Sequence, residues 1–265
     1  MNENLKWTAA AAAVVGLTIG GILYFDHWQK SRPLPAKPVT SVPTHPVAPA
    51  EPEIKHPVPV SDSNDALPSL DDSSVPMQNA LADLIGKESV DRYIIPDDLI
   101  RHIVVSIDNL TEQKVAERLR PVKPVPGKFA VAGSEDAPVL DPSNYPRYKP
   151  LVQSLRSIDT QRLAATYVRY YPLFQESYAN LGHPPQYFND RVIEVIDQLL
   201  ATPEVRDPIP LAQPGVQYEF ADPKLEALGA GQKMLIRMGT DNARSVKDKL
   251  RELRAVLVAQ SENRK

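Results

Sequence analysis

The apolar residues in the carboxyl-terminal part of the chain recur at the spacing of α-helices. In segment 241–258, five of them keep a strict 3-4-3-4 spacing: Ala243, Val246, Leu250, Leu253 and Leu257. Residues three and four positions apart share one helix face, so this segment is predicted to be an amphipathic helix. Similar patterns predict helices over 77–85, from Pro96 onward, around 148–155, and over 189–200 and 227–238.

Segment 159–182 carries a stripe of large apolar and aromatic side chains. Asp159 is a good amino-terminal cap for a helix that would end at Gly182. Pro172 lies inside the stripe and has no N–H to donate, so we expect a kink or a break at Tyr171. The stripe is interpreted as the core of the domain, with a ligand platform as the alternative. Its members are Leu163, Tyr167, Tyr170, Phe174, Tyr178 and Leu181.

Two short segments depart from the helical pattern. Prolines at 121, 124 and 126 exclude a helix there, and residues 129–131 are predicted to be a short strand. A second strand is expected over 216–220 and is a candidate to pair with the first. The predicted fold class is therefore mainly α, a single helical domain over 77–265 with a minor short β element.

The chain begins with a different pattern, an uninterrupted apolar run. Residues 7–25 contain no charge and are bounded by Lys6 and Asp26. As a helix they would span about 28 Å, close to the roughly 30 Å of a bilayer core. We therefore predict that 1–30 are an anchor that enters the membrane through 7–25 as one transmembrane helix. A cleaved signal peptide is the alternative, but the bulky residues at 22–25 lack its small-x-small cleavage pattern.

The flanking charges leave the orientation of this anchor open. Lys30, Arg32 and Lys37 slightly favour a cytoplasmic carboxyl side, which would suit a regulatory subunit. The short amino tail, the absence of cysteine and a proline-rich spacer are common in envelope proteins. We expect a single-pass inner-membrane protein with a periplasmic carboxyl-terminal domain. Gly16 and Gly20 lie one helical turn apart and could mediate a homodimer, although glycine is frequent in membrane helices.

Composition separates a spacer from the helical domain. The chain has 27 prolines against 11 glycines, and residues 31–76 contain eleven prolines but no glycine and no aromatic residue. A segment without aromatic side chains buries too little apolar area to offset the entropy of ordering. We therefore predict a disordered, proline-rich linker over 31–76 and a domain boundary near Pro76.

The candidate chemistry is sparse. With 30 basic and 33 acidic residues and no cysteine, nucleic-acid partners and thiolate sites are not expected. His102 and His183 lack metal-ligand spacing, and no complete nucleophile or dinucleotide motif occurs, so neither a metal nor a cofactor is expected. Asp190, Glu194 and Asp197 share one helical stripe and would suit a peptidoglycan hydrolase. Acids on a helix face are more ordinarily solvated or salt-bridged.

Two groups of residues form a candidate interaction surface. Tyr171 and Tyr187 lie off the aromatic stripe and are expected at the surface. Four basic residues of the last helix form a stripe opposite its leucines, with an ordinary solvated face as the alternative: Arg244, Lys247, Arg251 and Arg254. The candidate residues are Tyr171, Tyr187, Asn189, Asp190, Arg191, Arg244, Lys247 and Arg251.

Several short motifs occur in an order that resembles a known family. They are Asp108-Asn109-Leu110, Arg118-Leu119-Arg120-Pro121, Tyr171-Pro172-Leu173-Phe174-Gln175, Tyr187-Phe188-Asn189-Asp190-Arg191, Ile196-Asp197, and Gly231-Gln232-Lys233 through Arg237-Met238-Gly239. Together they resemble the bacterial domain-of-unknown-function family 3014 over nearly all of 70–258. The resemblance implies proteobacterial, often membrane-anchored proteins without an assigned activity, and therefore implies no catalytic residue.

These patterns favour a membrane-tethered, non-enzymatic interaction or scaffold domain of the cell envelope, binding a protein or a cell-wall partner. The alternative is a peptidoglycan-active hydrolase that uses the helix carboxylates.

Overall fold

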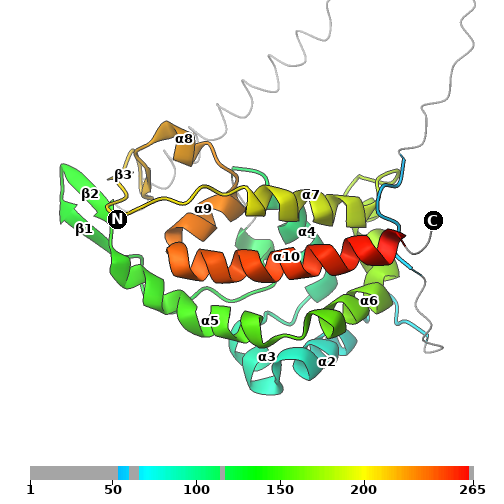
Figure 1. Ribbon diagram of the computed structural model, residues 1–265. Coiled ribbons are helices and arrows are strands. Elements are labelled where there is room, and N and C mark those ends of the chain that lie inside the picture. The colour runs from blue at the N-terminus through cyan, green and yellow to red at the C-terminus, as the bar shows by residue number, and fades with distance from the viewer. Residues whose placement is uncertain (1–52, 60–65, 114–116, 263–265) are drawn as a thin grey trace, which may run out of the picture. The chain divides into compact units, whose positions relative to one another are not determined.

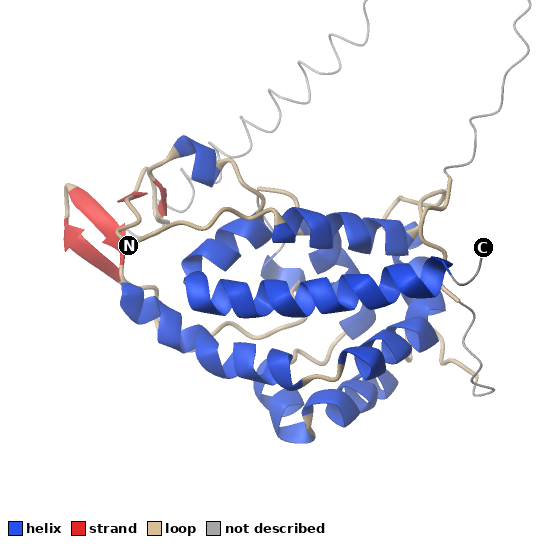
Figure 2. Ribbon diagram, in the orientation of Figure 1, coloured by secondary structure: helices blue, strands red, loops and turns tan. Residues whose placement is uncertain are grey.

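The computed structural model describes residues 53–59, 66–113 and 117–262, which belong to one unit, Glu51–Lys265. These residues are mainly helical, with two small β-hairpins at one end (Figure 2). Within the described ranges no helix is long and apolar enough to cross a membrane. The predicted membrane segment 7–25, with Gly16 and Gly20, lies outside the described residues.

Nine α-helices occur in the described part of the chain, and they match most of the predicted segments. Gly86 ends the first of them with a φ of 81°, a backbone conformation that favours glycine. The Asp159 carboxylate accepts the Arg162 N–H, as expected of a cap. The helices are α2 (Ser74–Ile85), α3 (Lys87–Tyr93), α4 (Leu99–Asn109), α5 (Tyr145–Ser157), α6 (Thr160–Asn180), α7 (Phe188–Leu200), α8 (Pro223–Glu226), α9 (Ala230–Arg237) and α10 (Thr240–Glu262).

Helix α10 runs across the middle of the domain, with α7 on one side and α5 and α6 on the other (Figure 1). Leu257 is buried, and Leu250 and Leu253 pack against the main core, so the predicted leucine face is confirmed. From α6, Tyr170, Phe174 and Tyr178 are buried in the same core. The interpretation of this stripe as core is confirmed for these three residues.

Helix α6 continues through Pro172 as one helix, so the predicted break at Tyr171 is wrong. The side chains on either side, Tyr171 and Leu173, are both buried. The missing N–H removes one backbone hydrogen bond, and burial of the surrounding aromatic and apolar groups outweighs that loss.

The β element consists of two separate antiparallel hairpins rather than one pair. Strand β1 (Val131–Ser134) pairs with β2 (Ala137–Leu140), and β3 (Leu211–Ala212) pairs with β4 (Glu219–Phe220). The expected pairing of 129–131 with 216–220 is therefore wrong, because each strand finds a partner across a short loop at lower entropic cost. The two segments still approach each other, since the rings of Phe129 and Tyr218 lie 6.3 Å apart.

Part of the predicted linker belongs to the folded domain. Val58 and Leu70 are only 5% exposed and join the main hydrophobic core, and α2 begins at Ser74. The prediction of a disordered segment up to Pro76 is wrong for residues 53–59 and 66–76. These residues bury apolar side chains in a core that later helices supply, so they need no aromatic residue of their own.

Candidate functional site

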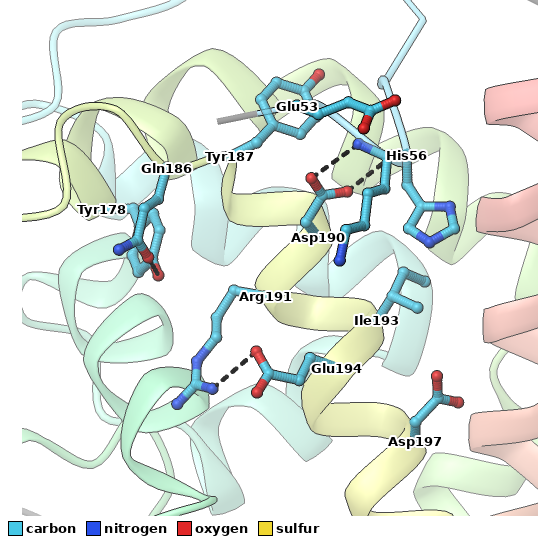
Figure 3. A pocket seen from close by; sticks show the side chains of 11 residues that line it. Glu53, His56, Tyr178, Gln186, Tyr187, Asp190, Arg191, Ile193, Glu194 and Asp197 are labelled. Atoms are coloured by element: carbon cyan, nitrogen blue, oxygen red, sulfur yellow. Dashed lines mark hydrogen bonds and ion pairs between the residues drawn. The ribbon is translucent and has the colours of Figure 1, made fainter. Parts of the chain in front are cut away.

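Residues 53–59, which we call the strap, lie along the amino-terminal part of α7 (Figure 3). One carboxylate of α7 binds two consecutive main-chain groups of the strap. The Lys55 N–H donates to Asp190 Oδ2 at 3.0 Å, and the His56 N–H donates to Asp190 Oδ1 at 2.7 Å. A carboxylate that accepts two backbone N–H groups makes charge-assisted hydrogen bonds, which are among the strongest in proteins.

Two neighbours of Asp190 complete the contacts to the strap backbone. Asn189 donates from Nδ2 to the His56 carbonyl at 2.9 Å, and the Tyr187 hydroxyl accepts the Val58 N–H at 2.8 Å. Three side chains from four consecutive positions therefore bind three N–H groups and one carbonyl. We call Tyr187, Asn189 and Asp190 the strap site.

Helix α6 holds the strap site in place through Gln175. Its Oε1 accepts the Phe188 N–H at 2.8 Å and the Tyr171 hydroxyl at 2.9 Å, and its Nε2 donates to the Gln186 carbonyl at 2.9 Å. These bonds fix the residues that lead into α7, whose first turn then carries Asn189 and Asp190. An acidic residue there is favoured by the helix dipole.

Two tyrosines of α6, the buried Tyr171 and the partly buried Tyr167, support the same residues through neutral hydroxyl groups. The Tyr167 hydroxyl donates to Asn189 Oδ1 at 3.1 Å, which orients the amide so that its Nδ2 faces the strap. The Tyr171 hydroxyl accepts the Asn189 N–H at 3.3 Å. Burial raises the pKa of both phenols well above the ordinary value, so neither ionises in the physiological range.

Arg191 joins the end of α4 to α7. Its Nε donates to Asp108 Oδ1 at 2.9 Å, and its other nitrogens reach the Asp108 carbonyl at 2.7 Å, Thr111 Oγ1 at 2.6 Å and Glu194 Oε2 at 3.0 Å. Two of the sequence motifs, around residues 108 and 190, thus meet in space. A planar guanidinium suits this arrangement because its donors are fixed in several directions at once.

An open hollow of about 450 Å³ lies between the strap and α7 (Figure 3). The strap, the loop before α7 and the exposed face of α7 all contribute to its wall. The lining residues are Glu53, Lys55, His56, Tyr178, Gln186, Tyr187, Asp190, Arg191, Ile193, Glu194 and Asp197.

The structure brings part of the first candidate group together at this hollow. Tyr187, Asp190 and Arg191 line it and are half-buried. Tyr171 is 8% exposed and Asn189 is 1% exposed, so the expectation of a surface position is wrong for both. Each is turned inward because its polar atoms are bonded inside the domain.

The basic residues of α10 do not line the hollow. Arg244 and Arg251 are exposed and pair with Glu204 and Asp248, as an ordinary solvated face would. Lys247 is buried and donates to a backbone carbonyl at Thr202, so its predicted exposure is wrong. Burial lowers the pKa of its ammonium group.

The contacts of the three helix carboxylates are all accounted for. Asp190 binds the strap, Glu194 pairs with Arg191, and Asp197 pairs with Arg254 of α10. In residues 53–59, 66–113 and 117–262, no group of three or more His, Asp or Glu side chains could hold a metal ion.

The strap residues are the part of the site that the sequence patterns did not indicate. Lys55, His56 and Val58 lie in a segment whose prolines are typical of an unfolded linker. The available signal was weak: two adjacent polar residues, Asn189 and Asp190, precede an apolar helix face. Such residues are equally expected of a helix start.

Taken together, the geometry defines a helical domain that holds an extended segment of its own chain through main-chain contacts. The family model described as "Protein of unknown function (DUF3014)" matches residues 99–254, and the chain belongs to this family. The family predicted from the motifs is thereby confirmed. No curated protein and no solved structure matches the chain significantly. The matched range contains the strap site but not the strap.

Proposed function

We propose that this protein is a membrane-tethered, non-enzymatic interaction domain of the bacterial cell envelope. Its strap site binds an extended segment of a protein partner. The observation that carries the proposal is the set of contacts by which Tyr187, Asn189 and Asp190 bind main-chain N–H and carbonyl groups. Hydrogen bonds to the main chain are the usual means by which proteins bind extended peptides.

The location of the domain follows from the predicted anchor. A membrane helix at 7–25 and an outward orientation would place the strap site in the periplasm, near the inner membrane. Partners would be envelope proteins or components of the cell wall, with no role for nucleic acid. A homodimer through Gly16 and Gly20 would bring two strap sites close together.

The contacts of the carboxylates favour this proposal over a peptidoglycan hydrolase. A glycosidase needs one carboxyl group that stays protonated as a general acid and a second that faces the substrate. Asp190, Glu194 and Asp197 instead accept hydrogen bonds from backbone N–H groups or from arginines. Each of the three carboxylates is thus engaged with a partner inside the domain, which supports a structural role for it.

Cross-linking in intact cells tests the proposal. The full-length protein would be cross-linked, purified and analysed by mass spectrometry, beside the Asp190→Asn and Asp248→Asn variants. Asp248 is an exposed acid of α10 paired only with its neighbour Arg251, so it is a matched control. We expect partners that are retained by Asp248→Asn and lost from Asp190→Asn. Identical partner sets for all three proteins would contradict binding at the strap site.

A further inference from the structure

The strap site binds the main chain of the strap, and the side chains of residues 53–55 are exposed. Ile54 is 50% exposed, and Lys55 is exposed as well. Val58, in contrast, is 5% exposed and belongs to the main core. A ligand must therefore present N–H groups at the positions of Lys55, His56 and Val58, with an aliphatic side chain at the last. Proline is allowed at the position of Pro57, where no N–H is used.

The hollow adds a preference for positive charge. From α7 it is lined by three carboxylates, those of Asp190, Glu194 and Asp197. Two guanidinium groups offset them, since Arg191 pairs with Glu194 and Arg254 of α10 pairs with Asp197. Three carboxylates against two guanidinium groups leave one excess negative charge at this wall, and Glu194 and Asp197 are exposed to solvent despite their arginine partners. Lys55 of the strap lines this wall. The remaining open volume of about 450 Å³ would admit a longer basic side chain such as arginine.

We infer that the strap is an exchangeable ligand, and that the partner segment that replaces it is an extended basic stretch of the pattern basic–any–Pro–aliphatic. This inference rests on the proposed function and specifies the partner's chemistry. Charge complementarity between the acidic wall and a basic residue supplies selectivity, while the main-chain contacts supply most of the affinity. The strap competes from within the same chain at a high effective concentration, so it lowers the apparent affinity for any partner.

The chain itself supplies a useful probe of this pattern. Residues 45–47 repeat the His-Pro-Val tripeptide of 56–58, but Thr44 stands where the strap has Lys55. A peptide of residues 42–49 therefore carries the backbone pattern without the basic side chain. A peptide of residues 53–59 carries both.

The test uses the full-length protein in detergent, in variants designed to release the strap from the strap site. The double variant Lys55→Pro/His56→Pro removes the two N–H donors to Asp190, and Ile54→Pro is the matched control because no hydrogen bond of its N–H is described. Labelled peptides would be titrated and followed by fluorescence anisotropy. We expect peptide 53–59 to bind the double variant at least tenfold more tightly than it binds wild type or Ile54→Pro. Adding Asp190→Asn should abolish this gain.

Three comparisons test the two parts of the inference separately, the preference for a basic residue and the exchange of the strap. A peptide 53–59 with the change Lys55→Glu should bind at least fivefold more weakly, and equal binding would overturn the basic preference while leaving the proposed function in place. Binding of 42–49 as tight as that of 53–59 would also overturn it, and would indicate a second copy of this chain as the source. Equal binding of 53–59 to wild type and to the double variant would overturn the exchangeable strap.

Folding of the variants is checked separately. Helix content and thermal midpoint should match those of Ile54→Pro. Val58→Asp vacates the site by removing the apolar contact instead of the donors, so it provides an independent second variant. Absence of peptide binding to both vacated, folded variants would overturn this inference, whereas the cross-linking experiment in cells tests the proposed function on its own.

Discussion

Replacing Asp190 with asparagine should release the strap while leaving the helical domain folded. The carboxylate accepts two N–H groups at 3.0 and 2.7 Å. An asparagine has one acceptor oxygen and no charge, so one bond is lost and the other weakens. A hydrogen bond to a charged group contributes about 1.5–3 kcal/mol. Because Asp190 is only half-buried, we expect a loss of about 1.5 kcal/mol, the lower end of that range.

Hydrogen exchange followed by mass spectrometry measures this loss directly. A loss of about 1.4 kcal/mol is a factor of ten in an equilibrium constant, so opening of the strap should become about tenfold more frequent. The amides of Lys55, His56 and Val58 should exchange faster by this factor, while amides within α10 keep their wild-type rates. Asp248→Asn should leave the strap unchanged. Unaltered exchange at the strap in Asp190→Asn would refute the reasoning.

Three other substitutions test the packing around the site and the domain. Gly239→Ala should lower the free energy of unfolding by at least about 2 kcal/mol in urea, because Gly239 has a φ of +84° and an added Cβ would lie 2.6 Å from the Tyr145 ring. Arg191→Lys should lower the free energy of unfolding by about 2 kcal/mol in the same assay, because an ammonium group cannot replace the several fixed N–H donors by which the guanidinium binds the end of α4. An unchanged free energy of unfolding would contradict this. Burial acts to raise the pKa of Glu226, but the hydrogen bond and charge of Lys233, together with the hydrogen bond from the Phe220 N–H, outweigh it and hold this pKa below the ordinary value near 4.5. A carboxyl group whose pKa is lowered in the folded state stabilises the fold fully at a pH above its unfolded-state pKa. This contribution disappears as the pH falls through the folded-state pKa. Wild type should therefore lose more stability than Glu226→Gln on acidification from pH 6 to pH 3.

The helices could be predicted because their signals are local. The leucine spacing of α10 and the Asp159 cap of α6 each depend on residues less than two helical turns apart. The predicted break at Tyr171 was wrong because that reasoning considered one hydrogen bond lost at Pro172 and not the burial of the flanking residues. The pairing of β3 with β4 could not be predicted from the local sequence pattern either, since a strand of two residues shows little periodicity.

The strap site shows where a single sequence stops being informative. Asp190 and Tyr187 were among the candidate residues and both contact the strap, but the strap lies 129 to 135 positions away from its partners. Nothing in the composition of 53–59 indicates that Val58 enters a core formed by later helices. Asn189 was placed in the candidate interaction surface, whereas its side chain is buried and its amide is bonded on both sides.

The strap also determines how easily trypsin could separate the domain from the residues that precede it. Between residues 31 and 86 the basic residues are Arg32, Lys37 and Lys55, and the first two are each followed by proline, which blocks trypsin. The bond after Lys55 is thus the one tryptic site in that interval, and the flanking N–H groups are both bound to Asp190. Cleavage requires the chain to leave the site, so its rate follows the fraction of molecules with the strap released. A partner that displaces the strap would therefore also expose the bond at which the domain can be shed.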